Sequence, residues 1–329
     1  MSEAPPKFKT LSRLRQTAGL RRLFAETRLH AADLVLPVFF AEQDSDAGPI
    51  EALPGVSRHT ISEAGDIARR AHDAGIGGVI AFGVPANKDA QGTAASTADG
   101  ATANALRAMR AAAPDLALMA DVCLCQYTDH GHCTIFDGTT RNLPATLDRY
   151  AEAAVTYAEA GADVVAPSGM IDGQVAAIRA GLDRANHAHT ALLSYAVKHA
   201  SAWYGPFRDA AGSTPAFGDR RTHQMPAGNA REAIREALQD EAEGADALMV
   251  KPAGTNLDTL ARLTDASDLP LAAYQVSGEY ASIRHLAAAS GDSERDLLLE
   301  SLMAIRRAGA SVILTYGALD AAGWLANQA

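Results

Sequence analysis

The chain has 329 residues, of which 48% are hydrophobic and 21% are charged, and its formal net charge is −10. Its length fits one large domain or two ordinary ones, and the negative charge argues against a nucleic acid as a partner. No apolar run is long enough to span a bilayer, and no basic segment precedes an apolar signal core, so we expect a cytoplasmic protein without a membrane partner. The three cysteines lie close together and are odd in number, which favours a reducing compartment over a disulfide framework.

Positive charge is concentrated at the N-terminus. Residues 1–30 contain seven Lys or Arg residues and two acidic residues, a net charge of +5 that leaves −15 for the rest of the chain. We therefore expect residues 1–30 to form an arm that docks on an acidic neighbouring subunit of a homo-oligomer. The alternative is a solvated basic tail, because chain termini are usually loose unless other groups hold them.

Along residues 31–329, short apolar runs rich in β-branched residues alternate with Ala-rich segments of helical period. The eight runs are 34–40, 78–82, 116–123, 163–167, 191–195, 247–251, 271–276 and 312–316. Helix candidates lie near 62–74, 100–113, 144–160, 173–186, 229–243, 256–265, 280–308 (in two pieces) and 318–327. Strict alternation implies parallel strands, so this α/β pattern predicts a single (β/α)8 TIM barrel after the extended N-terminal arm. A doubly wound open sheet is the alternative, although no Gly-x-Gly-x-x-Gly motif follows a strand.

Cap residues mark several of these helices. We expect Ser62, Asn142 and Asn229 to begin helices, because their side chains can accept a hydrogen bond from a free backbone N–H group. Gly161 and Gly244 stand where two helices should end, since glycine readily adopts the left-handed conformation found there.

The third run leads into a stretch that holds all three cysteines. Cys123, Cys125 and Cys133 follow the spacing Cys-x-Cys-x7-Cys. Thiolates favour zinc over hard cations, and three protein ligands leave the fourth tetrahedral position open for water or a substrate oxygen. We therefore expect a catalytic zinc site, with the strand ending at Cys123 so that both neighbouring cysteines reach one ion. The alternatives are a strand with incidental cysteines, a redox pair, and a structural zinc completed by His130 or His132.

Polar residues end most of the predicted strands. In a (β/α)8 barrel the carboxyl ends of the strands meet at the mouth that holds the active site. We expect these side chains to converge there: Asp121, Ser168, Lys198, Lys251, Ser277 and Tyr316.

The two lysines of this set are candidates for covalent chemistry. The chain has only five lysines among its 29 basic residues (Lys7, Lys9, Lys88, Lys198 and Lys251), and the last two follow buried apolar runs. Burial and a second nearby cation lower the pKa of a lysine, so the neutral amine can attack a carbonyl group and form a Schiff base. The alternative is that both side chains extend to solvent at the barrel rim.

Residues 199–228 form a long segment, rich in glycine and proline, between the fifth predicted strand and its helix. Segments of this kind are usually functional lids. Arg208, Arg220 and Gln224 lie in it, and arginine suits the bidentate grip of a carboxylate. A phosphate is less favoured, because the loops after the last two strands lack a glycine-rich phosphate pattern. Arg–Asp pairs within the loop are the alternative.

Short motifs follow one another in order along the chain. They are Asp-Val-Cys-Leu-Cys (121–125), His-Gly-His-Cys (130–133), Ala-Pro-Ser (166–168), Ser-Tyr-Ala-Val-Lys (194–198), Tyr-Gly-Pro-Phe-Arg-Asp (204–209), Pro-Ala-Phe-Gly-Asp-Arg-Arg (215–221), Met-Val-Lys-Pro (249–252), Tyr-Gln-Val-Ser-Gly-Glu-Tyr (274–280) and Ile-Leu-Thr-Tyr (313–316). With these motifs the chain resembles the porphobilinogen synthase (5-aminolaevulinate dehydratase) family over nearly its whole length.

The resemblance implies a lyase of tetrapyrrole (haem) biosynthesis that condenses two molecules of 5-aminolaevulinate to porphobilinogen with loss of water. By the family's pattern, Lys251 forms a Schiff base with the first substrate, and Ser277 and Tyr316 hold its carboxylate. Lys198 would bind the second substrate. The further residues implied for that substrate are Asp121 near its amino group and the carboxylate ligands Arg208, Arg220 and Gln224. Ser168, which follows the fourth predicted strand, is a further candidate for substrate binding.

The same resemblance implies cofactors and an assembly. The cysteines at 123, 125 and 133 match the zinc-using branch, and Glu236 matches a position that helps to bind magnesium between subunits in many members. The implied assembly is a homo-octamer of arm-exchanged dimers.

The sequence departs from the family pattern at Gly169, residues 253–256, His223 and Gly317. These positions flank the implied first-substrate pocket and leave a paralogue with a different amino ketone as an alternative. A class I aldolase on the same barrel would need only one Schiff-base lysine and no thiolate zinc. A non-catalytic zinc-binding barrel would need neither the lysines nor the arginines of the lid.

Overall fold

The structure, a computed structural model, describes residues 10–327. In this part of the chain, eight parallel strands close into a barrel, because the last strand also pairs with the first. In order around the barrel they are β1 (Leu34–Ala41), β4 (Gly78–Val84), β5 (Ala117–Val122), β8 (Val164–Pro167), β9 (Ala191–Lys198), β10 (Ala247–Lys251), β11 (Leu271–Gln275) and β12 (Val312–Thr315). The predicted (β/α)8 barrel is confirmed, and each predicted run supplies one strand.

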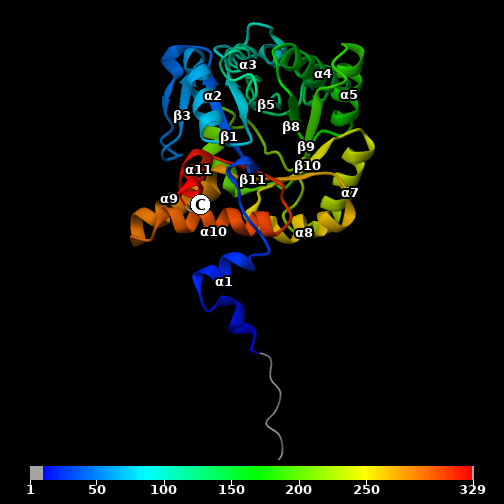
Figure 1. Cartoon of the computed structure of the whole chain (residues 1–329). Coiled ribbons are helices and arrows are strands. Elements are labelled where there is room, and N and C mark those ends of the chain that lie inside the picture. The colour runs from blue at the N-terminus through cyan, green and yellow to red at the C-terminus, as the bar shows by residue number, and fades with distance from the viewer. Residues whose placement is uncertain (1–9, 328–329) are drawn as a thin grey trace, which may run out of the picture.

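Helices surround the barrel (Figure 1). They are α2 (Ala64–Asp73), α3 (Ala101–Ala112), α4 (Leu143–Glu159), α5 (Gln174–Arg184), α7 (Ala230–Ala242), α8 (Leu257–Ala266), α9 (Ser277–Ser290), α10 (Glu294–Arg307) and α11 (Ala318–Ala326). The strands are therefore covered on both faces, as is typical of parallel sheets, and every residue of β1 and β4 is buried. The region expected to hold two helices, 280–308, is divided at Gly291, which has a φ of +74°.

Several predicted helix ends are also confirmed. The Asn142 side chain accepts a hydrogen bond from the backbone N–H of Ala145 at 3.1 Å and so caps α4. Gly161 and Gly244 directly follow the last turns of α4 and α7 and have φ values of +102° and +105°. Glycine adopts this left-handed region without the steric cost that a Cβ atom would add.

The assignment of Ser62 as a cap is wrong. A short 3-10 helix, η4 (Ile61–Glu63), precedes α2, and Thr60 begins it. The backbone N–H of Thr60 donates to the Glu63 carboxylate at 2.8 Å. The capping residue thus stands two residues earlier than expected, because the short helix η4 precedes α2.

Some elements had no counterpart in the prediction. They are the strands β2 (Gly48–Pro49), β3 (Ser57–Thr60), β6 (Phe136–Asp137) and β7 (Thr140–Arg141), and the 3-10 helices η2 (Ala31–Asp33), η3 (Asp44–Asp46), η5 (Thr93–Ser96) and η7 (Gly254–Asn256). The strand β3 pairs with β1 in parallel and with β2 in antiparallel fashion. None of these segments has the apolar run on which the prediction of strands relied.

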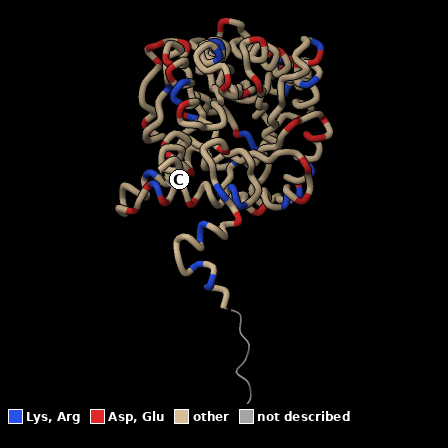
Figure 2. The backbone as a smooth tube through the Cα atoms, viewed as in Figure 1, with Lys and Arg blue, Asp and Glu red and all other residues tan. Residues whose placement is uncertain are grey.

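The segment before β1 extends away from the barrel (Figure 1). It contains η1 (Leu11–Arg15) and α1 (Ala18–Leu23), neither of which has a buried residue. Several large apolar side chains of η1 and α1 are exposed, with 77% of the surface of Leu11 and 68% of that of Leu23 accessible, whereas Leu29, closer to β1, is buried. Arginine residues lie along the described part of this segment (Figure 2). Residues 1–9, including Lys7 and Lys9, lie outside the described residues.

No helix in the described part of the chain combines the length and the apolar character needed to cross a membrane.

Candidate active site

Lys198 and Lys251 lie side by side at the carboxyl ends of neighbouring strands. Lys198 ends β9, Lys251 ends β10, and the two residues are partners in the parallel register. Only 6% and 5% of their surfaces are exposed. The alternative in which both side chains extend to solvent is therefore wrong, and two amines share one buried mouth.

Aromatic rings surround the Lys251 amine. Its Nζ atom lies 4.2 Å from the ring centre of Tyr274 and 5.0 Å from the ring centres of Tyr195 and Phe207. Burial, and then the cation of Lys198, lower the pKa of Lys251 to about 7. Burial removes the water that stabilises the charged form, and the second cation repels it. A substantial fraction of the amine is therefore neutral near neutral pH, as attack on a carbonyl group requires.

Asp121, on β5, brings a carboxylate to the two lysines. Gln126 Nε2 donates to its Oδ2 atom at 3.2 Å, whereas Oδ1 is buried and has no hydrogen-bond partner within residues 10–327. Burial raises the pKa of Asp121, although the charges of Lys251 and Lys198 act in the opposite direction. The backbone carbonyl of Ser168, which follows β8, accepts a hydrogen bond from Lys198 Nζ at 2.5 Å. The free Oδ1 atom is available to a bound molecule.

Ser277 and Tyr316 lie on the Lys251 side of the mouth. Ser277 is the first residue of α9 and lies two positions after the end of β11, and its hydroxyl accepts a hydrogen bond from the backbone N–H of Phe207 at 3.0 Å. The Tyr316 hydroxyl lies 3.0 Å from the Tyr274 hydroxyl, which donates to it. The rings of Phe207 and Tyr274 both lie next to the Lys251 amine. The hydroxyls of Ser277 and Tyr316 are therefore linked, through these two residues, to the surroundings of that amine.

The segment 199–228 is more structured than its length and composition suggest. It contains a 3-10 helix, η6 (Ala202–Tyr204), and a short helix, α6 (Gly205–Ala210). The Ser201 hydroxyl accepts from the backbone N–H of Trp203 at 3.1 Å and begins the first of them. The N–H groups of His199 and Met225 donate to the carbonyl oxygens of Lys251 and Lys198 at 3.0 and 3.1 Å. The segment is thus tied at both ends to the strands that carry the two lysines.

Arg208, Arg220 and Gln224 lie on this segment. Arg220 is buried, and its Nη2 atom donates to the backbone carbonyls of Gly131, at 2.7 Å, and Ser213. The Nε atom of Arg208 and the Nε2 atom of Gln224 are buried without a hydrogen-bond partner among the described residues. The Arg–Asp pairing that the sequence left open instead joins two exposed residues of this segment, Arg221 and Asp219, at 3.7 Å. Donors therefore remain available to an anion.

The three cysteines form one buried cluster. Their sulfur atoms all lie within 4.8 Å of one another, and β5 ends at Val122, so the chain can turn Cys123 and Cys125 toward one point. Hydrogen bonding with Cys125, followed by burial, raises the pKa of Cys123 to about 11. Buried thiols have no solvent to stabilise their ionised form, so a soft metal cation suits this donor set.

His130 and His132 do not join the cysteine cluster among the described residues. Both rings pack against Phe136 and Phe217, and His132 Nε2 lies 2.9 Å from the carbonyl oxygen of Phe217. The histidines thus contact the segment 199–228 instead of completing a four-ligand structural site. The cluster provides three sulfur ligands, which agrees with an open metal site.

Comparisons with known proteins identify the family of this chain. Residues 8–324 match the family described as delta-aminolevulinic acid dehydratase. The chain belongs to this family. The delta-aminolevulinic acid dehydratases of Streptomyces coelicolor and Mycobacterium tuberculosis are each 52% identical to it, over 94% and 95% of this chain and 95% and 96% of those proteins. A crystal structure of the Toxoplasma gondii enzyme in complex with the reaction product porphobilinogen matches with a TM-score of 0.95 and 38% identity, and covers 99% of this chain and 93% of that one.

As a delta-aminolevulinic acid dehydratase, the chain is a lyase, and the predicted family, fold and enzyme class are confirmed. The comparisons do not support the class I aldolase or the non-catalytic zinc-binding barrel. The roles of individual residues depend on the geometry described above and stay predictions.

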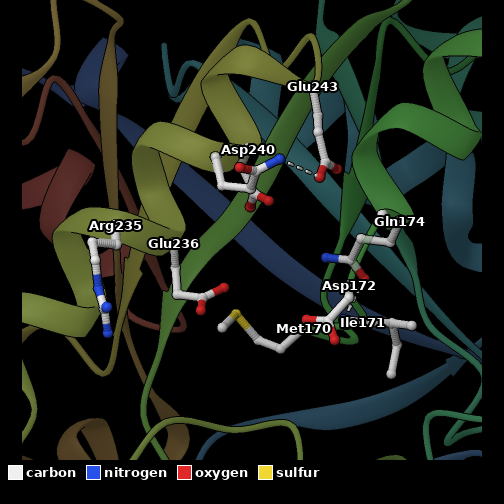
Figure 3. Close-up of a pocket in the computed structure, with 10 residues that line it drawn as sticks. Met170, Ile171, Asp172, Gln174, Arg235, Glu236, Asp240 and Glu243 are labelled. Atoms are coloured by element: carbon white, nitrogen blue, oxygen red, sulfur yellow. Dashed lines mark hydrogen bonds between the residues drawn. The ribbon is translucent and has the colours of Figure 1, made fainter.

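Glu236 does not lie with the other predicted site residues of this dehydratase. It is part of α7 and lines a separate pocket with Asp172, Asp240 and Glu243 (Figure 3). The carboxylates of Glu236 and Asp172 both point into this pocket (Figure 3). Burial, and then the charge of Asp172, raise the pKa of Glu236, and burial raises the pKa of Asp240 to about 7. Clustered carboxylates of this kind can hold a hard cation.

Tyr195 was not among the site residues predicted from the sequence, although its ring centre lies 5.7 Å from Lys198 Nζ and 5.0 Å from Lys251 Nζ. Side chains alternate along a regular strand, so residues three apart should face opposite sides. The pairing of β9 with β10 shifts register between Leu248 and Val250, which leaves an additional residue in β9. This bulge reverses the alternation and turns Tyr195 and Lys198 to the same side.

Proposed function

We propose that this chain condenses two molecules of 5-aminolaevulinate to porphobilinogen with loss of water. The observation that carries the proposal is the buried, register-paired Lys198 and Lys251, with the pKa of Lys251 lowered to about 7. A reaction that joins two amino ketone molecules can use one lysine to bind each of them, whereas an aldolase needs only one Schiff-base lysine. The product bound to the Toxoplasma gondii relative supports the same substrate.

Lys251 would act on the first substrate. Its neutral amine attacks the ketone carbon, and elimination of one water molecule leaves a Schiff base between Nζ and that carbon. The hydroxyls of Ser277 and Tyr316 would donate hydrogen bonds to the carboxylate of the same molecule. The rings around Lys251 exclude water, which keeps the amine neutral and protects the Schiff base from hydrolysis.

Lys198 would form the corresponding bond with the second substrate. Its amine is held by the carbonyl of Ser168, and the free Oδ1 atom of Asp121 would accept a hydrogen bond from a substrate amino group. Two substrates on adjacent lysines are thereby placed within reach of each other. Holding both reactants in one orientation removes much of the entropic cost of joining them.

We assign residues 199–228 to a lid that binds the second carboxylate. The free Arg208 Nε and Gln224 Nε2 atoms, together with Arg220, supply donors for this group. Charge-assisted bonds from a planar guanidinium match the geometry of a carboxylate. The lid belongs to a single catalytic barrel of residues 31–329, and residues 1–30 form the arm.

We propose zinc as the metal of the cysteine site. Cys123, Cys125 and Cys133 fit it because they are buried soft donors that can converge on one point. When bound there, zinc would supply a Lewis acid that polarises or positions a group of the second substrate. Burial acts to lower the pKa of Arg220, but the nearby cysteine charges raise it overall. Conversely, the Arg220 cation would stabilise the thiolates as ligands.

Two further assignments concern the assembly. Magnesium would bind at Glu236, because the pocket gathers carboxylate oxygens, which hard cations prefer. The exposed apolar and basic side chains of residues 10–30 support an arm that packs on another copy of the chain, and we propose a homo-octamer. We also propose that the protein is cytoplasmic, because cysteines remain free thiols in a reducing compartment.

Trapping the Schiff base with borohydride tests the proposed reaction. In the presence of 5-aminolaevulinate, borohydride should fix one substrate mass to the peptide that contains Lys251, and the zinc-loaded protein should release porphobilinogen. Lys251→Arg keeps the positive charge but lacks the nucleophile, so it should abolish the adduct at this position and the product. Lys198→Arg is the matched control, because it should keep the Lys251 adduct and lose the product.

The outcomes separate the remaining possibilities. An adduct at Lys251 without porphobilinogen would indicate a paralogue that joins a different amino ketone. No adduct at Lys251 would contradict the mechanism.

A further inference from the structure

Two basic side chains that the proposed reaction does not use bind the carboxyl end of α6. Arg58 Nε donates to the carbonyl oxygen of Ala210 at 2.7 Å, and Arg58 Nη2 donates to that of Asp209 at 2.6 Å. Lys88 Nζ donates to the carbonyl oxygen of Gly212 at 2.5 Å. A helix leaves its last carbonyl oxygens without intrahelical partners and carries partial negative charge at this end. The two cations therefore cap the carboxyl end of α6 and the turn after it.

The capping side chains belong to the barrel, whereas α6 belongs to the lid. Arg58 is part of β3 and is register-paired with Phe39 of β1 and Gly48 of β2. Lys88 lies in the loop that follows β4. Gly212 has a φ of +55°, and a Cβ atom added there would lie 3.3 Å from Lys88 Nζ. The close approach of lid and barrel at this point thus depends on a glycine.

No carboxylate competes for these cations in the described residues. Within residues 10–327, all side-chain hydrogen bonds of Arg58 and Lys88 go to the backbone of residues 209–212. Burial lowers the pKa of Lys88; Cys125 acts in the opposite direction, and the nearby Arg58 charge adds to the lowering. Two half-buried cations placed together repel each other, and their hydrogen bonds to the carbonyl oxygens of the lid help to offset this repulsion.

The helix α6 connects this contact to the site. Its Phe207 places a ring 5.0 Å from Lys251 Nζ and donates its backbone N–H to the Ser277 hydroxyl at 3.0 Å. The next residue is Arg208, whose buried Nε atom has no partner among the described residues. Fixing the carboxyl end of α6 therefore holds both side chains over the mouth.

We propose that Arg58 and Lys88 form a clasp that keeps the lid closed and sets the affinity for the second substrate through Arg208. The inference rests on the proposed function, because Arg208 needs a substrate carboxylate to bind. Both residues are positioning residues, since neither touches the reacting groups. Weakening the clasp lowers the closed population, so it raises KM for the second substrate while the closed enzyme keeps its chemistry.

Steady-state kinetics and amide hydrogen exchange on the full-length, metal-loaded chain test the clasp. Arg58→Met and Lys88→Met should each raise KM for 5-aminolaevulinate about tenfold and leave kcat within about twofold. The amides of residues 211–213 should exchange faster in both variants in the absence of substrate. Arg58→Lys should restore part of the affinity, because one ammonium group can reach only one of the two carbonyl oxygens. Arg69→Met, at an exposed position on α2, is the charge-matched control and should leave KM, kcat and the exchange of residues 211–213 unchanged.

Each outcome decides for or against the clasp. An unchanged KM in Arg58→Met and Lys88→Met would overturn it, and so would a raised KM without faster exchange at residues 211–213. If Arg58→Met does not fold, Lys88→Met and Arg58→Lys carry the same comparison. Failure of the proposed function would appear separately, as wild-type protein that makes no porphobilinogen. In that case the exchange data would still show whether the two cations hold α6.

Discussion

Lys251 is a buried amine whose reactivity should depend on pH through a single deprotonation. Burial and the cation of Lys198 lower its pKa to about 7. Because the neutral amine is present above this pKa and lost below it, the rate of adduct formation should rise with pH up to about 7 and then level off. Well below the pKa it should fall about tenfold for each pH unit. Borohydride trapping at short reaction times across this range measures the midpoint.

Variants of Lys198 show whether the neighbouring cation contributes to this midpoint. Lys198→Met removes the charge that repels a protonated Lys251, so the midpoint should move to higher pH. Lys198→Arg retains a cation and should leave the midpoint close to that of the wild type. A midpoint near the ordinary lysine value in the wild-type protein would contradict the burial argument.

The cysteine cluster should make catalysis, but not the fold, dependent on metal. We expect about one zinc ion per cysteine cluster, and removal of the metal with a chelator should abolish turnover. The eight barrel strands pair without the cluster, so the circular dichroism of the metal-free protein should remain native-like. Added zinc should restore the activity of the metal-free wild-type protein. Cys125→Ala should bind zinc more weakly and should not regain activity when zinc is added. Full turnover of this variant without metal would refute the zinc site.

At the scale of elements, the sequence determined which strands and helices form more clearly than how they are joined. Alternating apolar runs and Ala-rich segments were sufficient to predict the barrel. Strands such as β1 and β4 are buried on both faces, so their sequences are continuous apolar runs. The strand β3 has the sequence Ser-Arg-His-Thr and only half-buried residues. It carries no periodic signal, and so the position of Arg58 beneath the lid could not be predicted.

The two asparagines predicted as helix caps show why local signals have limits. Both occupy the N-cap position, of α4 and α7, but only the Asn142 side chain accepts a hydrogen bond from the first turn. Asn229 instead donates to the Glu232 carboxylate at 2.6 Å. The nearby Glu232 carboxylate competes with the helix backbone for the Asn229 side chain. The general preference for asparagine at helix starts does not include this competition.

The site also contains both predictable and unpredictable residues. Residues at strand ends, such as Lys198 and Lys251, were predictable because parallel strands bring their carboxyl ends together. Tyr195 was not, because a bulge in β9 changes the side that it faces. Lys88 was notable as one of five lysines, but its bond to Gly212 joins residues 124 positions apart. Such a contact depends on the folded path of the lid, which no local pattern encodes.

At the scale of the whole molecule, residues 1–30 should control assembly. This segment has a net charge of +5 against −15 for the remainder, and its described part exposes Leu11, Leu14, Leu23 and Phe24. Removing residues 1–30 should therefore produce a smaller and less active species, which sedimentation velocity would detect. The difference from the full-length chain should be greatest at low salt, because ions screen the attraction between the arm and an acidic neighbour over about 8 to 10 Å at moderate ionic strength.

Two full-length variants separate the charged and the apolar contributions of the arm. Replacing its five arginines (Arg13, Arg15, Arg21, Arg22 and Arg28) by glutamine should weaken assembly at low salt and have little effect at high salt, where the charges are already screened. Replacing Leu11, Leu14 and Leu23 by serine should weaken it at every salt concentration, since burial of apolar surface does not rely on charge. If the protein without residues 1–30 sediments as the full-length chain does, the arm has no role in assembly. The exposed leucines would then need another partner, because η1 and α1, which contain them, have no buried residue and so gain little from the barrel of their own chain.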